Sequence, residues 1–144
     1  MSINGLTNAG SLPALELTMR FAAQRQRLIA HNIANFDTPG FIHKDVSPAA
    51  FQRTLAEAVQ KRDERGGRGE IEWRETRELV RDDRGDLALN PRSTSGGLLH
   101  HDRNNRDIER VMQDLAETTS AFRVAAELHR AGRTMLMDAI QRTR

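Results

Sequence analysis

The sequence contains no cysteine, no tyrosine and a single tryptophan, and aromatic residues make up only 4% of its 144 residues. Without cysteine the chain can form neither a disulfide framework nor a thiolate metal site. The length fits one ordinary domain, but 38% hydrophobic residues is a small supply for a self-contained core. We therefore expect the chain to complete its burial against copies of itself or against partners.

Lysine and long apolar runs are also scarce. Lys44 and Lys61 are the only lysines among 22 basic residues, and an arginine-rich surface suits multidentate protein pairing as well as phosphate contact. The 20 acidic residues leave a net charge of only +2, whereas a nucleic-acid binder usually has a strong basic excess. No apolar run approaches the roughly 20 residues that span a bilayer. The N-terminal residues lack the pattern of a cleavable secretory signal, so we expect any export to use another route.

The apolar residues that are present predict a long helix over residues 12–35. Their spacing alternates between four and three, which is a heptad pattern. Ser11 and Pro13 suit the start of this helix, and Gln26 fills the one polar position of the heptad pattern. The packing seam of this helix is predicted to consist of Leu15, Met19, Ala22, Ile29 and Ile33, followed by Phe36.

A second long helix is predicted over residues 105–141. Its seam repeats every seven residues, at Ile108, Leu115, Phe122, His129 and Leu136. Asn104 or Asn105 can cap its start, and Asp107 lies in the first turn, where acidic side chains are favourable. The simplest burial pairs the two helices antiparallel. The predicted fold is therefore mainly α, with a coiled-coil-like assembly domain formed by residues 1–41 and 104–144.

Residues 42–103 differ in composition and predict a variable, loop-rich insert. Residues 49–61 suit a short helix, and residues 70–75 and 86–90 alternate as the strands of a small β-hairpin. Glycine and charge are concentrated between these segments. We expect the insert to be poorly ordered unless a partner binds it.

Candidate sites for chemistry are weak. His100, His101 and Asp102 could contribute to a metal site, but adjacent histidines in a glycine-rich loop rarely define one. Turn chemistry explains the Arg-Gly-Asp tripeptide at residues 84–86. The chain has no phosphate-binding loop and no convincing nucleophile–base arrangement. We expect no catalytic residue, no metal and no cofactor, and hence a protein that is not an enzyme.

The stretch "NIANFDTPGF", residues 32–41, follows the first predicted helix directly. Asn35 and Asp37 can bond the freed backbone groups, Pro39 cannot continue a helix, and Gly40 allows positive φ. Local chemistry alone therefore predicts a helix end followed by a turn, and this does not exclude a second role.

Two motifs resemble those of bacterial flagellar rod, hook and hook-associated proteins. The first is "HNIANFDTPGFIHKDV", in which the matching residues are Asn32, Ile33, Ala34, Asn35, Thr38, Pro39, Gly40 and Phe41. The second is "NNRDIERVMQ", in which Asn104, Asn105, Asp107 and Met112 match. The sequence departs from the family pattern at His31, Arg106 and Val111. The resemblance covers residues 12–50 and 102–141, and within the family the proximal rod proteins are the most similar.

This resemblance implies a structural subunit of the periplasmic flagellar rod. Members of the family pair their terminal helices and pack side by side into a tube that transmits torque and encloses the export channel. It implies export by the flagellar type III apparatus without a cleavable signal. The implied partners are copies of the chain, other rod proteins and the adaptor between the export gate and the MS ring. From composition alone, an arginine-rich nucleic-acid-binding module is the alternative.

Overall fold

The computed structural model describes residues 10–67, 69–93 and 105–142. The elements in chain order are α2 (Leu12–Ala34), β1 (Lys44–Asp45), α3 (Pro48–Glu64), β2 (Leu79–Arg81), β3 (Leu87–Leu89), β4 (Arg92–Ser93) and α4 (Asn105–Arg142). The predicted mainly α fold with two long terminal helices is confirmed.

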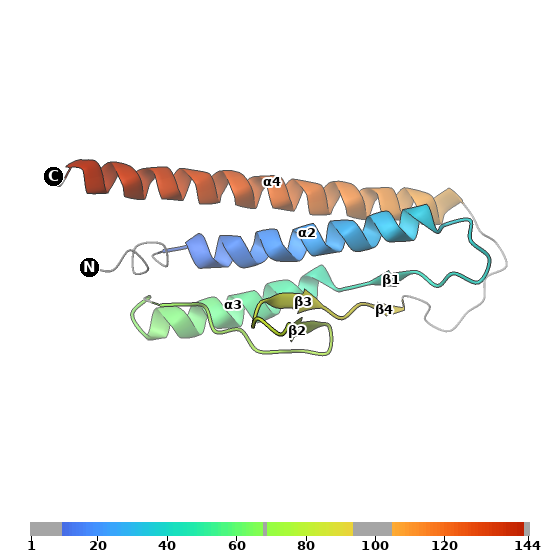
Figure 1. Ribbon diagram of the computed structural model, residues 1–144, viewed down its shortest axis with the longest axis horizontal. Helices are drawn as coiled ribbons and strands as arrows, with labels where there is room; N and C mark the ends of the chain where they lie inside the picture. The colour runs from blue at the N-terminus through green and yellow to red at the C-terminus, as the bar shows by residue number, and fades with distance from the viewer. Residues whose placement is uncertain (1–9, 68, 94–104, 143–144) are drawn as a thin grey trace.

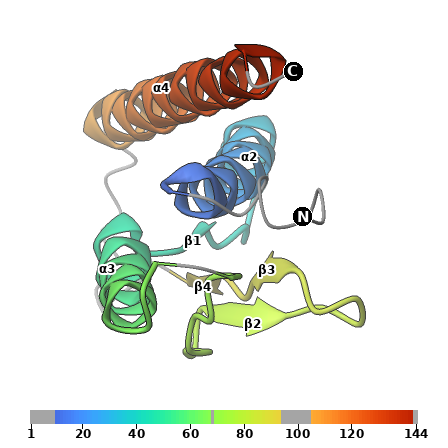
Figure 2. The same ribbon diagram turned by 90° about the vertical axis from the view of Figure 1, so that its left-hand side faces the viewer.

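The elements form three layers, with α2 in the middle. Figure 1 shows α4 running antiparallel along one side of α2, and α3 with the short strands along the other side. The end-on view of Figure 2 shows α3 and the β2–β3 hairpin side by side beneath α2. The first long helix is therefore covered on two sides, whereas α4 is covered on one. Among the described residues, no helix combines the length and the apolar character that crossing a membrane requires.

Local chemistry explains where α3 begins and ends. Ser47 is the N-cap, and its hydroxyl accepts a hydrogen bond of 3.2 Å from the backbone N–H of Ala50. At the other end Gly67 N–H donates to the carbonyl of Arg62, and Gly66 N–H donates to that of Asp63. Gly66 has φ +90°, so this end has the left-handed glycine and the paired bonds of a Schellman motif.

The strands form two short antiparallel pairs, β1 with β4 and β2 with β3. The predicted strand at residues 86–90 contains β3, but the predicted strand at residues 70–75 is wrong. Ile71 and Trp73 alternate inward, as expected of a strand, and both are buried. The backbone of this segment joins neither of the two ladders. The alternation of apolar and polar residues in this segment therefore reflects side chains that pack against the core, and it does not indicate a strand.

The hydrophobic core lies between α2 and the insert. Its buried members are Phe21, Val46, Phe51, Ala58, Ile71, Trp73, Leu79 and Leu87. The rings of Phe21 from α2 and Phe51 from α3 stack with centroids 4.1 Å apart. Large apolar side chains of the insert therefore pack in one cluster with Phe21 of α2. The expectation that the insert is poorly ordered without a partner stays a prediction. The proposed boundaries of the assembly domain and the insert stay a prediction.

Replacing Phe51 with alanine tests whether this layer stabilises the protein. Phe51 is 6% exposed, so Phe51→Ala leaves a cavity and is expected to lower the free energy of unfolding by about 3–5 kcal/mol. Denaturant titration followed by circular dichroism measures the change. Gln52→Ala, at the exposed neighbouring position, is the control and should stay within about 0.5 kcal/mol of the parent. Equal small effects of both substitutions would contradict the packed layer.

Candidate functional site

The residues of the first motif form the end of α2 and a tight turn. Asn35 N–H donates to the carbonyl of His31, and the Asn35 side chain donates to the same carbonyl at 2.9 Å. Phe41 N–H then donates to the carbonyl of Thr38 at 3.1 Å, and Gly40 has φ +77°. Proline followed by a glycine of positive φ inside such a bond is the pattern of a type II turn. The predicted helix end and turn are therefore confirmed.

Asn32 has a role that its sequence position does not reveal. The residue is 5% exposed, and its amide nitrogen donates to the carbonyl of Lys44 at 2.6 Å. Its amide oxygen accepts from the backbone N–H of Lys44 at 3.3 Å. One buried side chain thus satisfies both backbone groups of a β1 residue. The chain that leaves α2 is thereby brought back against the same helix.

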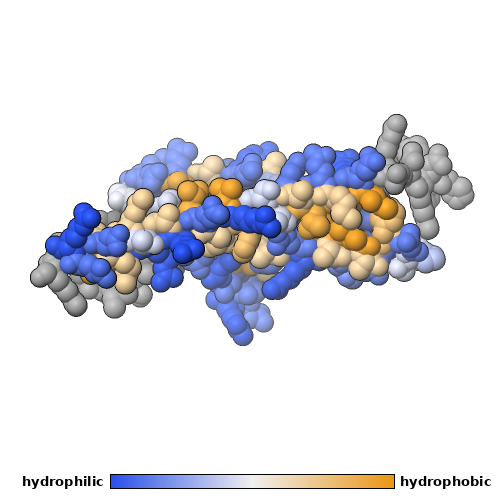
Figure 3. All heavy atoms as spheres, turned by 90° about the horizontal axis from the view of Figure 1, so that it is seen from above, coloured by the Kyte–Doolittle hydropathy of each residue, from blue (hydrophilic) through white to orange (hydrophobic). Residues whose placement is uncertain are grey.

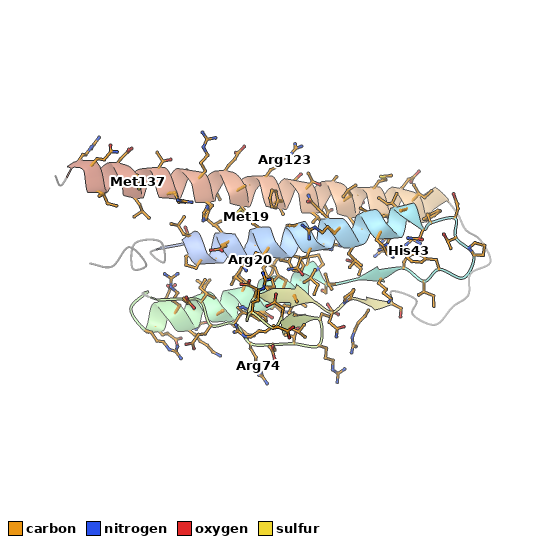
Figure 4. All side chains as sticks on the ribbon, in the orientation of Figure 1. Met19, Arg20, His43, Arg74, Arg123 and Met137 are labelled. Carbon is orange, nitrogen blue, oxygen red and sulfur yellow. The ribbon has the colours of Figure 1, made fainter. Side chains whose placement is uncertain are left out.

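Four rings gather around the turn. Phe41 makes edge contacts with His31 and with His43, and Phe36 makes one with His43, each with ring centroids 5.5 Å apart. Figure 4 places His43 beside the C-terminal end of α2. The turn is therefore held by ring packing as well as by its backbone bonds, while Ala34, Thr38 and Pro39 of the motif are exposed.

Arg25 forms the one polar cluster that joins all three layers in the described part of the chain. Arg25 is 3% exposed. The guanidinium makes two bonds to the Asp45 carboxylate, at 3.0 and 2.7 Å, and one to the Thr118 hydroxyl at 2.7 Å. The Asp114 carboxylate lies 3.4 Å away. Sequence reasoning missed this cluster, since an arginine in a heptad-patterned helix carries no signal of burial.

The electrostatics of Arg25 favour the charged guanidinium. Burial lowers its pKa, but the hydrogen bond and charge of Asp45, with those of Asp114, raise it above the ordinary value. A cation whose pKa is raised on folding adds stability that is fully present below the pKa of the unfolded chain. The contribution is lost only when the pH rises through the higher pKa of the folded state. Arg25 therefore carries its charge at every pH near neutrality.

The predicted packing seam between α2 and α4 consists mostly of buried or half-buried residues, and the seam itself stays a prediction. Ala22 and Ile29 are buried, and Ile108 is 38% exposed. The remaining seam members are half-buried, namely Leu15, Met19, Ile33, Leu115, Phe122 and Leu136. Beside them the Gln26 amide donates to the Thr119 hydroxyl at 3.0 Å. Of the predicted seam members only Ala22 and Ile29 are fully buried, so the large side chains of this seam are mostly half-covered.

The residues of the second motif are described only in part. Asn105 and Asp107 lie in the first turn of α4, and Met112 is 48% exposed. Asn104 and the candidate metal ligands His100, His101 and Asp102 lie outside the described residues. Within the ranges that the structure covers, no group of three or more histidine, aspartate or glutamate side chains could hold a metal ion.

The outward surface of α4 carries a row of apolar side chains. Val124, Leu128, Ala131 and Met135 follow one another at spacings of four, three and four, which places them on one stripe of the helix. We call these four residues the α4 stripe; they are all exposed, with Met135 at 71%. Ile108, Met112, Met137 and Ile140 add further exposed apolar groups along the same helix. Figure 3, which looks onto α4 from above, shows apolar and polar groups mixed along this surface.

A small cavity of about 10 Å³ lies in the core between Leu17, Phe51 and Leu79. It has room for one water molecule at most.

Comparisons with protein-family models and with curated proteins find no match to this chain. Functional inference therefore depends on the two motifs, on the helix pair and on the exposed side of α4.

The pairing of Asn32 with Lys44 can be tested by replacing Asn32 with alanine and, as a control, Asn35 with alanine. Asn32→Ala removes both bonds and leaves backbone groups of β1 without a side-chain partner, so we expect a loss of about 1–3 kcal/mol in the free energy of unfolding. Asn35→Ala, four residues further on and less buried, should cost about 1 kcal/mol or less. Chemical denaturation measures both. Equal costs would show that the buried pairing does not hold β1 against α2.

Proposed function

We propose that the chain is a structural subunit of the bacterial flagellar rod, of the proximal kind represented by FlgB. The short length and the "NN-x-D" form of the second motif favour FlgB over FlgC, the second proximal rod protein and the nearest alternative. The proposed location is the periplasmic part of the basal body. Export proceeds through the flagellar type III apparatus.

The motif and the helix pair support this proposal together. The resemblance implies terminal helices that pair antiparallel, and α2 and α4 do so over most of their length (Figure 1). The residues that match the first motif form the junction between α2 and the insert, because Asn32 and the Gly40 turn return the chain to α2. A motif at this junction suits a family whose inserts differ while the helix pair is kept.

The observation that carries the proposal is the exposed side of α4. A helix of 38 residues buries only Thr118 and Ala125 among the side chains described for it. Val124, Leu128 and Met135 are more than half exposed. Exposed apolar rows of this kind mark interaction surfaces. Side-by-side packing of further helices on α4 would cover them, as assembly into a tube requires.

The proposed mechanism is mechanical and has no chemical step, so we propose no catalytic residue and no cofactor. Torque passes from subunit to subunit through many helix contacts, and the hollow packing leaves a channel for export. The partners are copies of this chain, other rod proteins and the adaptor between the export gate and the MS ring. The insert, packed on the opposite side of α2, does not cover the α4 surface (Figure 2).

Deletion of the gene in the bacterium that carries it, followed by complementation, tests the proposal. We expect the deletion strain to be non-motile and to lack rods, and the parent gene to restore swimming. Met135→Glu should fail to restore it, because assembly would bury an unpaired carboxylate at a cost of several kcal/mol. Thr134→Glu, an exposed neighbour outside the α4 stripe, adds the same charge and should restore swimming.

Two outcomes separate the parts of this proposal. Full motility of the deletion strain would refute the rod assignment itself. Restoration of swimming by both variants would leave the assignment standing and would refute the role of the α4 stripe. Circular dichroism of both purified variants is the control for folding, and we expect no difference, since both positions are exposed.

A further inference from the structure

The residue pattern of the seam between α2 and α4 repeats every seven residues. The pattern alone therefore does not fix the position of α4 along the axis of α2. On α4 the larger seam residues recur every seven positions, and the positions between them are small, namely Thr118, Ala125, Gly132 and Ala139. A shift of α4 by one heptad, about 10 Å along the helix axis, presents similar apolar groups to α2. Apolar packing alone therefore discriminates poorly between neighbouring registers.

The polar contacts across the seam do not repeat. The Arg25 guanidinium donates to the Thr118 hydroxyl at 2.7 Å and lies 3.4 Å from the Asp114 carboxylate. Because its side chain is 4% exposed, water cannot replace a lost partner cheaply. Gln26 donates to Thr119 at 3.0 Å in the next position. Two adjacent α2 side chains thus require particular residues on α4.

A shift of one heptad in either direction removes these partners. In one direction Ala121 and Ala125 would take the places of Asp114 and Thr118, and neither can accept a hydrogen bond through its side chain. In the other direction Asp107 and Val111 would take those places, so the hydroxyl acceptor is lost although a carboxylate remains. A buried guanidinium is thus satisfied in full only in the observed register.

One apolar contact marks the same register at the other end of the pair. Gly132 lies so close to Leu12 that a β-carbon on it would come within 2.9 Å of a Leu12 methyl. The two shifted registers would place Ala139 or Ala125 opposite Leu12. The contact between Leu12 and Gly132 is therefore specific to the observed register. Because the end of the Leu12 side chain can move, this contact fixes the register less strongly than the Arg25 cluster does.

We propose that Arg25, with Asp114 and Thr118 on α4 and Asp45 on β1, determines the register of α4 on α2. Buried polar residues in coiled coils are best attested in this role. Arg25 is a positioning residue: it fixes which residues of α4 lie beside the insert and which face outward. The inference concerns the fold of the free chain, so it stands whether or not the rod assignment holds.

The absence of cysteine allows a direct measurement of the register. Three variants of the full chain each carry one cysteine pair: Leu12→Cys with Gly132→Cys, with Ala125→Cys or with Ala139→Cys. Mild oxidation and gel mobility then give the yield of each intramolecular disulfide. We expect the pair at residues 12 and 132 to crosslink in the parent background, and the other two pairs to crosslink poorly.

The same pairs are then placed in a background that lacks the charges, Arg25→Met with Asp45→Asn and Asp114→Asn. Replacing all three leaves no unpaired buried charge, so the helix pair should still form. We expect the ratio of shifted to native crosslinks to rise about tenfold or more, because the lost bonds to a charged group favour only one register. Arg20→Met is the matched control, since Arg20 also pairs with two carboxylates but is half exposed and bonds Asp86 of the insert.

Each outcome bears on the proposal. Shifted crosslinks in the triple variant and not in Arg20→Met support it. Native crosslinks alone in a folded triple variant would overturn it, and so would equal shifts in Arg20→Met. Loss of helical circular dichroism in the triple variant would also overturn it, since the cluster would then hold the fold as a whole.

Discussion

The buried guanidinium of Arg25 is the constraint on which the layers depend. A charge removed from water is costly unless it is paired and hydrogen-bonded. The acceptors of its hydrogen bonds lie on both sides of α2, because Asp45 belongs to β1 and Thr118 to α4. The three layers therefore cannot separate, or slide past one another, without leaving a buried charge with fewer partners. Apolar packing and polar contacts both hold α2 to the insert, whereas few large apolar side chains are buried between α2 and α4.

The uneven distribution of large apolar side chains on the two sides of α2 has a consequence for α4. The large side chains of the core, such as Phe21, Phe51 and Trp73, lie between α2 and the insert. Few remain for the other side of α2, where Thr118 and Ala125 are the buried members of α4. A 38-residue helix bound along one narrow seam presents most of its surface outward, including Val124 and Leu128 (Figure 4 shows Arg123 pointing away from α2). Apart from Ile42, the exposed large apolar side chains of the described residues thus all lie on α4.

Sequence periodicity predicted the two long helices well, since each keeps a heptad pattern over many turns. It could not locate the core, because Phe21, Phe51 and Trp73 are far apart in sequence and their meeting depends on tertiary packing. The alternation at residues 70–75 predicted a strand that the structure lacks, because Ile71 and Trp73 are buried in the core without a partner strand for their backbone. For the candidate site, glycine and proline chemistry predicted the turn at Gly40. The burial of Arg25 and the partner of Asn32 left no local signal, because both depend on residues that are distant in sequence and meet only in the fold.

The first motif and the Arg25 cluster act as one connected unit. Asn32 binds both backbone groups of Lys44, and the next residue, Asp45, binds Arg25. Arg25 and Asn32 are seven residues apart, so they lie on the same side of α2, two turns from each other. The turn at Gly40 returns the chain to this side, Asn32 fixes β1 there, and β1 supplies the carboxylate that neutralises Arg25. Since Arg25 also binds Thr118, the geometry of "NIANFDTPGF" extends through one buried cation to the position of α4. A stretch that ends a helix thereby also constrains how the helix pair is assembled.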